Sequence, residues 1–174
     1  MPEAPLPQAD IILTDDQALA VAIQTADCVP LLIADARTGA VAAAHAGWRG
    51  LAAGVPRVAV AALARHFDAR PADLVVAVGP SISAACYEVG LEVREQFAAT
   101  HTDRLDEWFP KETRAGHWLF DGWRAARDQL LRSGLDDRNI HSSGLCTFTN
   151  AELCSYRRDG RGAGRMAAAV RVSR

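Results

Sequence analysis

A cysteine and a histidine stand at the ends of two neighbouring apolar segments of this sequence. Cys28 comes immediately before the apolar run at residues 29–34, and His45 follows the run at residues 39–44. Taken alone, a cysteine usually packs, and a histidine is often a hydrogen-bonded structural residue. Where the two meet, they can be two ligands of a zinc or copper ion, or a nucleophile and its base. The residue types leave both chemistries open.

The two apolar segments are predicted to form a hairpin that brings Cys28 and His45 together. Residues 35–39, Asp-Ala-Arg-Thr-Gly, have the composition of a tight hairpin loop. If residues 36–39 form the loop, residue 28 lies opposite residue 47, and Cys28 and His45 lie diagonally on one face. A register shifted by one residue would separate them, and the sequence does not fix the register.

The segment after His45 could bind an anion. Residues 47–50, Gly-Trp-Arg-Gly, lead into a predicted helix, and the glycines would let backbone N–H groups approach a ligand closely. Arg49 is a candidate for binding phosphate or carboxylate, although the chain is rich in arginine. Residues 155–165 hold four arginines among glycines, a composition that by itself predicts a solvated loop. Cys86 could line a pocket, but packing is the more common role of such a cysteine.

The elements that must position these residues are short strands followed by alternating strands and helices. Residues 100–118 are polar and are predicted to be irregular. No linker, internal repeat or low-complexity tract divides the chain, so we predict a single α+β domain over residues 1–174. We expect strands at residues 11–14, 19–24, 29–34, 39–44, 74–78, 139–142 and 166–172, and helices at about 55–67, 90–99 and 121–132, the last capped by Asp121.

Composition places the chain among ordinary globular domains. It has 174 residues, 49% apolar and 23% charged, which is enough to bury a core without disulfides or a structural metal. A net charge of -2 gives no support for binding to nucleic acid or to an anionic membrane surface. Without a secretory signal or an apolar run of about 18 residues, we expect a cytoplasmic protein. The four cysteines lack the spacing of a zinc finger or disulfide framework, and each is expected to be a free thiol.

Five short segments, in a fixed order, cover nearly the whole chain. They are Thr-Ala-Asp-Cys-Val-Pro at 25–30, Ala-His-Ala-Gly-Trp-Arg-Gly at 44–50, Gly-Pro at 79–80 with Tyr-Glu-Val-Gly at 87–90, Cys-Thr at 146–147, and Ser-Tyr-Arg-Arg-Asp-Gly at 155–160 followed by Gly-Arg at 164–165. Together they resemble one family closely, the YfiH-like proteins. This family is also called the multicopper polyphenol oxidase or laccase-domain family, and its members are known as purine nucleoside phosphorylases.

The resemblance implies a fold, a metal site and a reaction. The fold is α+β, with a mixed β core flanked by helices. The metal, usually zinc with copper as the alternative, is held by His, Cys and His, of which the second and third match Cys28 and His45. The reaction is phosphorolysis of adenosine or inosine to the free base and ribose 1-phosphate, with adenosine deamination as a further activity. We do not expect phenol oxidation as the principal role, because the chain lacks the several histidine clusters of a multicopper oxidase.

The implied reactions suggest roles for four further residues. Phosphorolysis needs cations around phosphate and stabilisation of an oxocarbenium-like sugar, for which Arg49, Arg157 and Arg158 are the candidates. Deamination needs a metal-activated water and a nearby acid or base, and Asp27 is the candidate. Purine nucleoside and phosphate are therefore the expected partners. The sequence leaves the preferred nucleoside undecided, and also whether the protein is a monomer or a homo-oligomer.

The family's first histidine ligand lies in a Gln-Val-His-Gly-like string upstream of the matched segments, and we expect this chain to lack that N-terminal segment. A catalytic zinc ordinarily has three protein ligands, and only two are identifiable here. Either the working protein is longer, or the site is degenerate, or another group is the third ligand. His117, His141 and a residue of a partner chain are the candidates for that group.

Three functions remain open at this point, in order of preference. The first is a zinc-dependent purine nucleoside enzyme. The second is a metal-free hydrolase with Cys28 as nucleophile and His45 as base, which needs no third ligand. The third is a non-catalytic remnant that binds a nucleoside or a partner protein.

Overall fold

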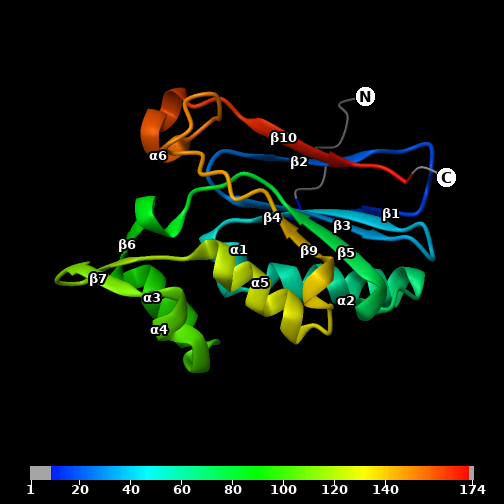
Figure 1. Ribbon diagram of the computed structural model, residues 1–174, viewed down its shortest axis with the longest axis horizontal. Helices are drawn as coiled ribbons and strands as arrows, with labels where there is room; N and C mark the ends of the chain where they lie inside the picture. Colours follow the sequence, from blue (N-terminus) through cyan, green and yellow to red (C-terminus); the bar gives the residue numbers. More distant parts are fainter. Residues whose placement is uncertain (1–8, 173–174) are drawn as a thin grey trace, which may run out of the picture.

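A five-stranded mixed sheet forms the centre of the computed structural model, which describes residues 9–172 (Figure 1). The strand order is β1-β4-β3-β5-β9, and only β5 and β9 pair in parallel. The sheet therefore combines a hairpin with a crossover, as an α+β fold does. The strands are β1 Ile11–Thr14, β3 Val29–Asp35, β4 Val41–Ala46, β5 Leu74–Val78 and β9 Ile140–Ser142.

The β3–β4 hairpin has the register that brings Cys28 and His45 together. Val29 pairs with Ala46, and the pairing continues without a shift along the hairpin. The loop is closed by Asp35, which is buried and whose carboxylate accepts hydrogen bonds from the Arg37 N–H at 2.8 Å and the Thr38 hydroxyl at 3.0 Å. This Asp-centred loop contains residues 36–39, as predicted, and thereby selects one of the two registers that the sequence allows.

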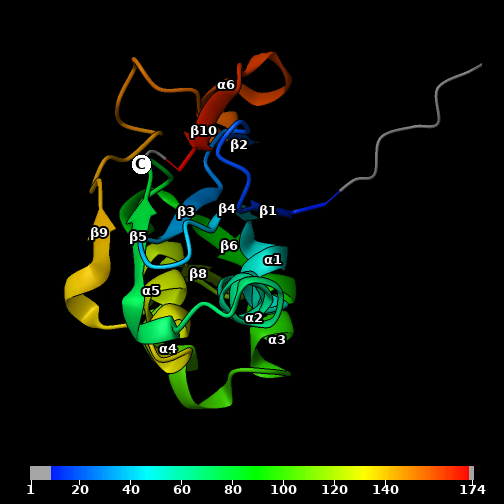
Figure 2. The same cartoon turned by 90° about the vertical axis from the view of Figure 1, so that its right-hand side faces the viewer.

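A second, two-stranded sheet covers one face of the central sheet. It pairs β2, Val21–Thr25, with β10, Met166–Val170, in antiparallel register (Figure 2). Side chains of β4 alternate between this layer and the helices, so Val41 packs in a small cluster with Val21 and Ile23. Both faces of β4 are consequently buried, which accounts for its run of apolar residues.

Helices cover the other face of the central sheet. They are α1 Trp48–Ala52, α2 Val55–Phe67 and α5 Gly122–Arg132. Helix α2 buries Ala59, Val60 and Leu63 against the sheet. Helix α5 is capped by Asp121, whose carboxylate accepts a hydrogen bond from the Arg124 N–H at 2.9 Å, as expected from the sequence. The longest of these helices has 13 residues, and no helix within residues 9–172 is long and apolar enough to span a membrane.

The prediction that residues 100–118 are irregular is wrong in part. They include helix α4 and two strands of a small three-stranded sheet in the order β6-β8-β7. Trp108 is fully buried, and its ring and that of Phe97 make a T-shaped, edge-to-face contact at 5.8 Å between centroids. These elements are short and depend on aromatic packing from outside the segment, which local periodicity does not reveal. The bounds are α3 Leu91–Ala98, α4 Leu105–Trp108, β6 Glu88–Gly90, β7 Lys111–Arg114 and β8 His117–Leu119.

The remaining predicted elements are confirmed, with shifted ends. Strand β2 begins at Val21 rather than residue 19, and β10 ends at Val170 rather than residue 172. The predicted loop at 155–165 contains a short helix, α6 Tyr156–Asp159. All four cysteines are free, as expected. The α+β class with a mixed sheet flanked by helices is confirmed.

Candidate functional site

A cavity of about 680 Å³ opens where the β3–β4 hairpin meets the segment before α1. Cys28 and His45 both line it, together with Gly47 and Arg49 from the segment that follows His45. Residues from the far end of the chain close the opposite wall, among them Tyr156 and Arg157 of α6. The cavity is thus assembled from segments about 130 positions apart, and it lies within the size range of small-molecule sites.

Cys28 and His45 point at the same position in this cavity. A β-carbon built on Gly47 would lie 3.0 Å from the Cys28 Sγ and 3.7 Å from the His45 Nε2, so glycine is needed there for both side chains to keep their places. His45 Nδ1 lies 2.9 Å from a carboxylate oxygen of Asp10. The hydrogen bond with Cys28 raises the pKa of His45 to about 9, against the lowering effect of burial and with help from Asp10.

The Asp10–His45 pair has the form found behind many metal ligands. A carboxylate that accepts from one ring nitrogen fixes the tautomer and leaves the other nitrogen free to bind a metal. Cys28 and His45 therefore fit zinc or copper in donor type. Within residues 9–172, however, no three His, Cys, Asp or Glu side chains gather as a metal-binding group. The described part of the chain offers two donors of the expected set.

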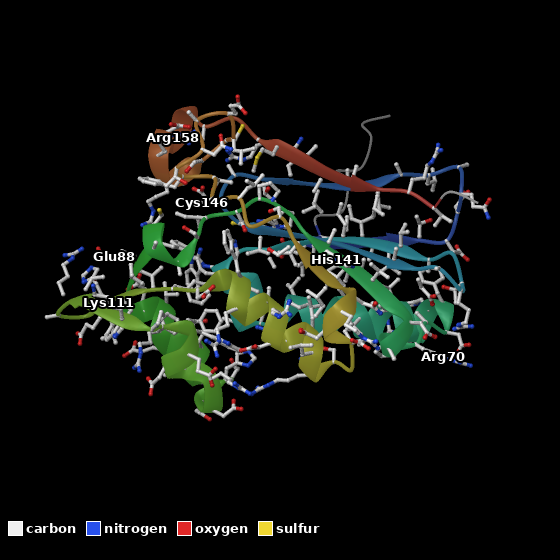
Figure 3. All side chains as sticks on the ribbon, in the orientation of Figure 1. Arg70, Glu88, Lys111, His141, Cys146 and Arg158 are labelled. Carbon is white, nitrogen blue, oxygen red and sulfur yellow. The ribbon has the colours of Figure 1, made fainter. Side chains whose placement is uncertain are left out.

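The structure does not bring His117 or His141 to this position. His117 lies on β8 with its Nδ1 3.2 Å from the carbonyl oxygen of Ala115, and it lines a neighbouring groove instead. His141 is exposed on β9, opposite Ala77 of β5 and well away from α6 (Figure 3). Neither of these histidines is a third ligand in this fold.

Two arginines of the expected set face the cavity. The Arg49 guanidinium lies 4.2 Å from the centre of the Trp48 ring, and its side chain makes no hydrogen bond or ion pair with any residue of the described range. The Arg157 guanidinium lies 5.0 Å from the centre of the Tyr87 ring and donates to the Glu88 carbonyl at 2.9 Å. Stacking on aromatic rings holds both cations in place while leaving N–H groups for a ligand.

Arg158 lies outside this group, although it neighbours Arg157 in sequence. Its guanidinium donates to the backbone carbonyls of Thr147, Asn150 and Leu153 at 2.7 to 3.1 Å and pairs with the Asp159 carboxylate. These contacts hold the loop that precedes α6. Figure 3 shows the position of Arg158 on α6.

Asp27 adjoins Cys28 but its carboxylate is occupied. One oxygen accepts from the Thr147 hydroxyl at 2.5 Å, and the other accepts from the Arg157 backbone N–H at 2.6 Å. Its carbonyl accepts from the Ile82 N–H at 3.0 Å. Asp27 also has a φ of 83°, an uncommon value for a residue other than glycine. Asp27 therefore joins three segments of the chain at the cavity.

Sequence reasoning did not single out several residues that line the cavity. Tyr87 packs on Phe120 at 5.7 Å between ring centres, and burial raises the pKa of its hydroxyl to about 12. Arg165 also lines the cavity, although its Nη1 donates to the Ala163 and Gly164 carbonyls. Both residues stand within the segments that carry the family resemblance, which is the signal that could have identified them. Asp10 stands outside those segments.

Comparison with known proteins gives a consistent result. The family model described as multi-copper polyphenol oxidoreductase laccase matches residues 2–173. Among curated proteins, the chain is 42% identical to a purine nucleoside phosphorylase of Streptomyces coelicolor, over 97% of this chain and 66% of the relative. It is 40% identical to a purine nucleoside phosphorylase of Pseudomonas aeruginosa, over 94% of this chain and 64% of the relative.

Two solved structures have folds similar to that of this chain. YlmD from Geobacillus stearothermophilus superposes with a TM-score of 0.89 at 34% identity, covering 97% of this chain and 62% of YlmD. The hypothetical protein YfiH of Bacillus licheniformis also gives 0.89, at 30% identity, covering 94% of this chain and 61% of that protein. The chain thus spans about two thirds or less of the length of the proteins it matches.

Proposed function

We propose that the cavity binds a purine nucleoside and phosphate and takes part in nucleoside phosphorolysis, because the chain belongs to the multi-copper polyphenol oxidoreductase laccase family. The observation that supports this most is the placement of Arg49 and Arg157 around the cavity that also holds Cys28 and His45. The names of the curated relatives agree with it.

In phosphorolysis, a phosphate oxygen bonds to C1′ of the ribose while the glycosidic bond breaks and its electron pair leaves with the purine. The phosphate must be held against the sugar, and positive charge that develops on the ribose must be stabilised. Arg49 and Arg157 are suited to bind and orient the phosphate, because guanidinium groups form paired, charge-assisted hydrogen bonds with its oxygens. The bound anion then lies beside the developing charge of the sugar.

Cys28 and His45 are the residues that would hold a metal, with zinc as the first choice and copper as the alternative. A metal there would supply a Lewis acid or an activated water. In this chain, Asp10 accepts from His45 Nδ1 and so directs Nε2 toward Cys28. Adenosine deamination is a further activity that we propose for the same site only in the presence of such a metal.

We assign Asp27 a positioning role in this reaction. Both of its carboxylate oxygens accept short hydrogen bonds, from Thr147 and Arg157, which hold the carboxylate in one place. The bond to the Arg157 backbone fixes the start of α6 and with it the guanidinium that faces the cavity. This role differs from the acid or base expected from sequence.

The proposal is tested by incubating the purified chain with adenosine or inosine, phosphate and zinc, and separating the products by chromatography. We expect free base and ribose 1-phosphate in equal amounts, with inosine appearing from adenosine if deamination also occurs. Arg49→Ala is expected to raise the KM for phosphate at least tenfold. Arg70→Ala is the matched control, because Arg70 is exposed at the far end of the molecule (Figure 3). Failure of both nucleosides to react would refute the function for this chain.

A metal-free hydrolase is the second candidate, supported by the hydrogen bond between Cys28 and His45. Here we expect one equivalent of iodoacetamide on Cys28 to abolish hydrolysis and chelators to have no effect. Loss of activity with chelators and its return with zinc would favour the phosphorylase instead.

A further inference from the structure

Two neighbouring cysteines lie outside the residues that line the cavity. Cys146, in the loop after β9, and Cys86, in the turn before β6, are both partly exposed, and their thiols are hydrogen-bonded to each other. No step of the proposed reaction uses them.

The sulfur of Cys146 is surrounded by hydrogen-bond donors. The Ser83 hydroxyl lies 3.2 Å from it and the Ser83 backbone N–H donates to it at 3.4 Å. The backbone and side chain of Thr149 contact it as well. A neutral thiol needs few donors, whereas several donors aimed at one sulfur stabilise the thiolate.

The acidities of the two thiols differ in the direction that these contacts imply. Burial raises the pKa of Cys146, but the hydrogen bonds from Ser83 and Thr149 outweigh it and bring the pKa to about 6. Burial raises the pKa of Cys86, and the neighbouring Cys146 raises it further against the effect of Ser83. One sulfur is thus a thiolate near neutral pH, and the other keeps its proton.

We propose that Cys146 is a modification site for low-molecular-weight disulfides such as glutathione disulfide, and that Cys86 is its resolving thiol. The Cys146 thiolate attacks one sulfur of the disulfide, forms a mixed disulfide and releases one thiolate. Cys86 then gives up its proton to the solvent and attacks the Cys146 sulfur, releasing the second thiolate. The two protein thiols lose two electrons, and the small disulfide gains them as two thiols.

Such a modification would affect the cavity through Thr147. Thr147 follows Cys146, is fully buried, and donates its hydroxyl hydrogen bond to Asp27. A group attached to the Cys146 sulfur would displace the loop that holds Thr147. It would thereby weaken the hydrogen bond from Thr147 to Asp27, the residue before Cys28. This consequence rests on the proposed function, whereas the thiol chemistry does not.

Mass spectrometry of the purified chain tests the chemistry independently of activity. With glutathione disulfide at pH 7, we expect a Cys86–Cys146 disulfide in the wild type, and a glutathione adduct on Cys146 that persists in Cys86→Ser. Cys146→Ser should leave Cys86 unmodified, and Cys154→Ser is the matched control. At pH 6, iodoacetamide should label Cys146 faster than Cys86, because the larger thiolate fraction of Cys146 outweighs its lower nucleophilicity.

Equal labelling of Cys146 and Cys86, or no persistent adduct in Cys86→Ser, would overturn the proposal. The activity of the oxidised chain, measured before and after reduction with dithiothreitol, then tests the coupling to the cavity. We expect a reversible loss of most activity. Full activity in the disulfide form would refute the coupling alone. A reduced chain without activity would refute the proposed function, and the mass measurements would still decide the thiol chemistry.

Discussion

Asp27 occupies the left-handed region of the backbone map, at a φ of 83°, with contacts from three distant residues around it. A residue with a side chain in that region costs roughly 1–2 kcal/mol, which the surroundings must offset. The hydrogen bonds from Thr147 and the Arg157 backbone do so here. The conformation is therefore a product of the tertiary structure, and it sets the direction in which the next residue, Cys28, enters the cavity.

If Asp27 positions the site, Thr147→Val and Asp27→Asn should lower phosphorolysis to a similar extent, and the double variant should be little worse than either. Removing the hydroxyl leaves a carboxylate oxygen without its donor, which costs about 1–3 kcal/mol of stability. Thr147→Ser, which keeps the hydroxyl, should retain activity. Steady-state kinetics over a range of pH checks this. A large loss in Asp27→Asn together with a normal Thr147→Val would indicate that Asp27 transfers a proton.

The rate at which Cys146 is alkylated should depend on pH. Because its pKa is lowered to about 6, the sulfur is mostly deprotonated at pH 7 and mostly protonated at pH 5. The rate of alkylation should therefore fall about tenfold between pH 7 and pH 5. Ser83→Ala removes the hydroxyl donor and should move the midpoint upward. Peptide mapping after timed iodoacetamide pulses measures both. A midpoint unchanged in Ser83→Ala would show that the hydroxyl does not stabilise the thiolate.

At the scale of elements, the β3–β4 hairpin decides whether Cys28 and His45 meet. Their side chains lie on one face only in the register that pairs Val29 with Ala46. The buried loop residue Asp35 holds this register through bonds to the Arg37 backbone and to Thr38. A site at one end of the hairpin thus depends on a carboxylate at the other end.

Asp35→Ala should lower the free energy of unfolding by about 1–3 kcal/mol, because it removes the buried carboxylate that accepts from the Arg37 N–H and the Thr38 hydroxyl. Urea denaturation followed by circular dichroism measures the change. Asp15→Ala, at an exposed position, is the control and should alter stability by less than about 0.5 kcal/mol. Equal stability of the two variants would contradict the role given to Asp35.

At the scale of the whole molecule, the cavity exists only because the C-terminal segment packs against β2 and the start of the β3–β4 hairpin. Strand β10 pairs with β2, and the loop after β9 packs beside Asp27 through Thr147. Arg158 holds that loop by donating to several of its carbonyls. The loop after β9 and helix α6 are therefore part of the site.

Arg158→Ala should lower the stability of the protein and speed proteolysis within residues 148–153, because the Thr147 and Leu153 carbonyls lose the donor that holds the loop. Arg161→Ala, at an exposed position in the same segment, should change neither. Limited chymotrypsin digestion, which can cleave after Phe148 and Leu153, together with thermal unfolding checks both. A stable Arg158→Ala variant with a raised KM for phosphate would instead make Arg158 a substrate-binding residue, as expected from sequence.

The sequence by itself determined the α+β class and most strands and helices, and it identified Cys28 and His45 as candidates for one site in one of two hairpin registers. These follow from local signals: apolar runs of strand length, the Asp-to-Gly loop and the capping residue Asp121. It could not determine the elements within residues 100–118, because their stability comes from aromatic contacts such as that between Phe97 and Trp108.

The tertiary structure alone decided which side chains face the cavity. Arg157 and Arg158 are equivalent in sequence, but neighbouring residues of a helix point about 100° apart, so α6 directs one into the cavity and the other into its own loop. The sequence suggested Asp27 as an acid or base, but only the fold shows that residues 120 and 130 positions away donate hydrogen bonds to its two carboxylate oxygens. Contacts over such distances depend on how the elements pack, and no local pattern of residues encodes them.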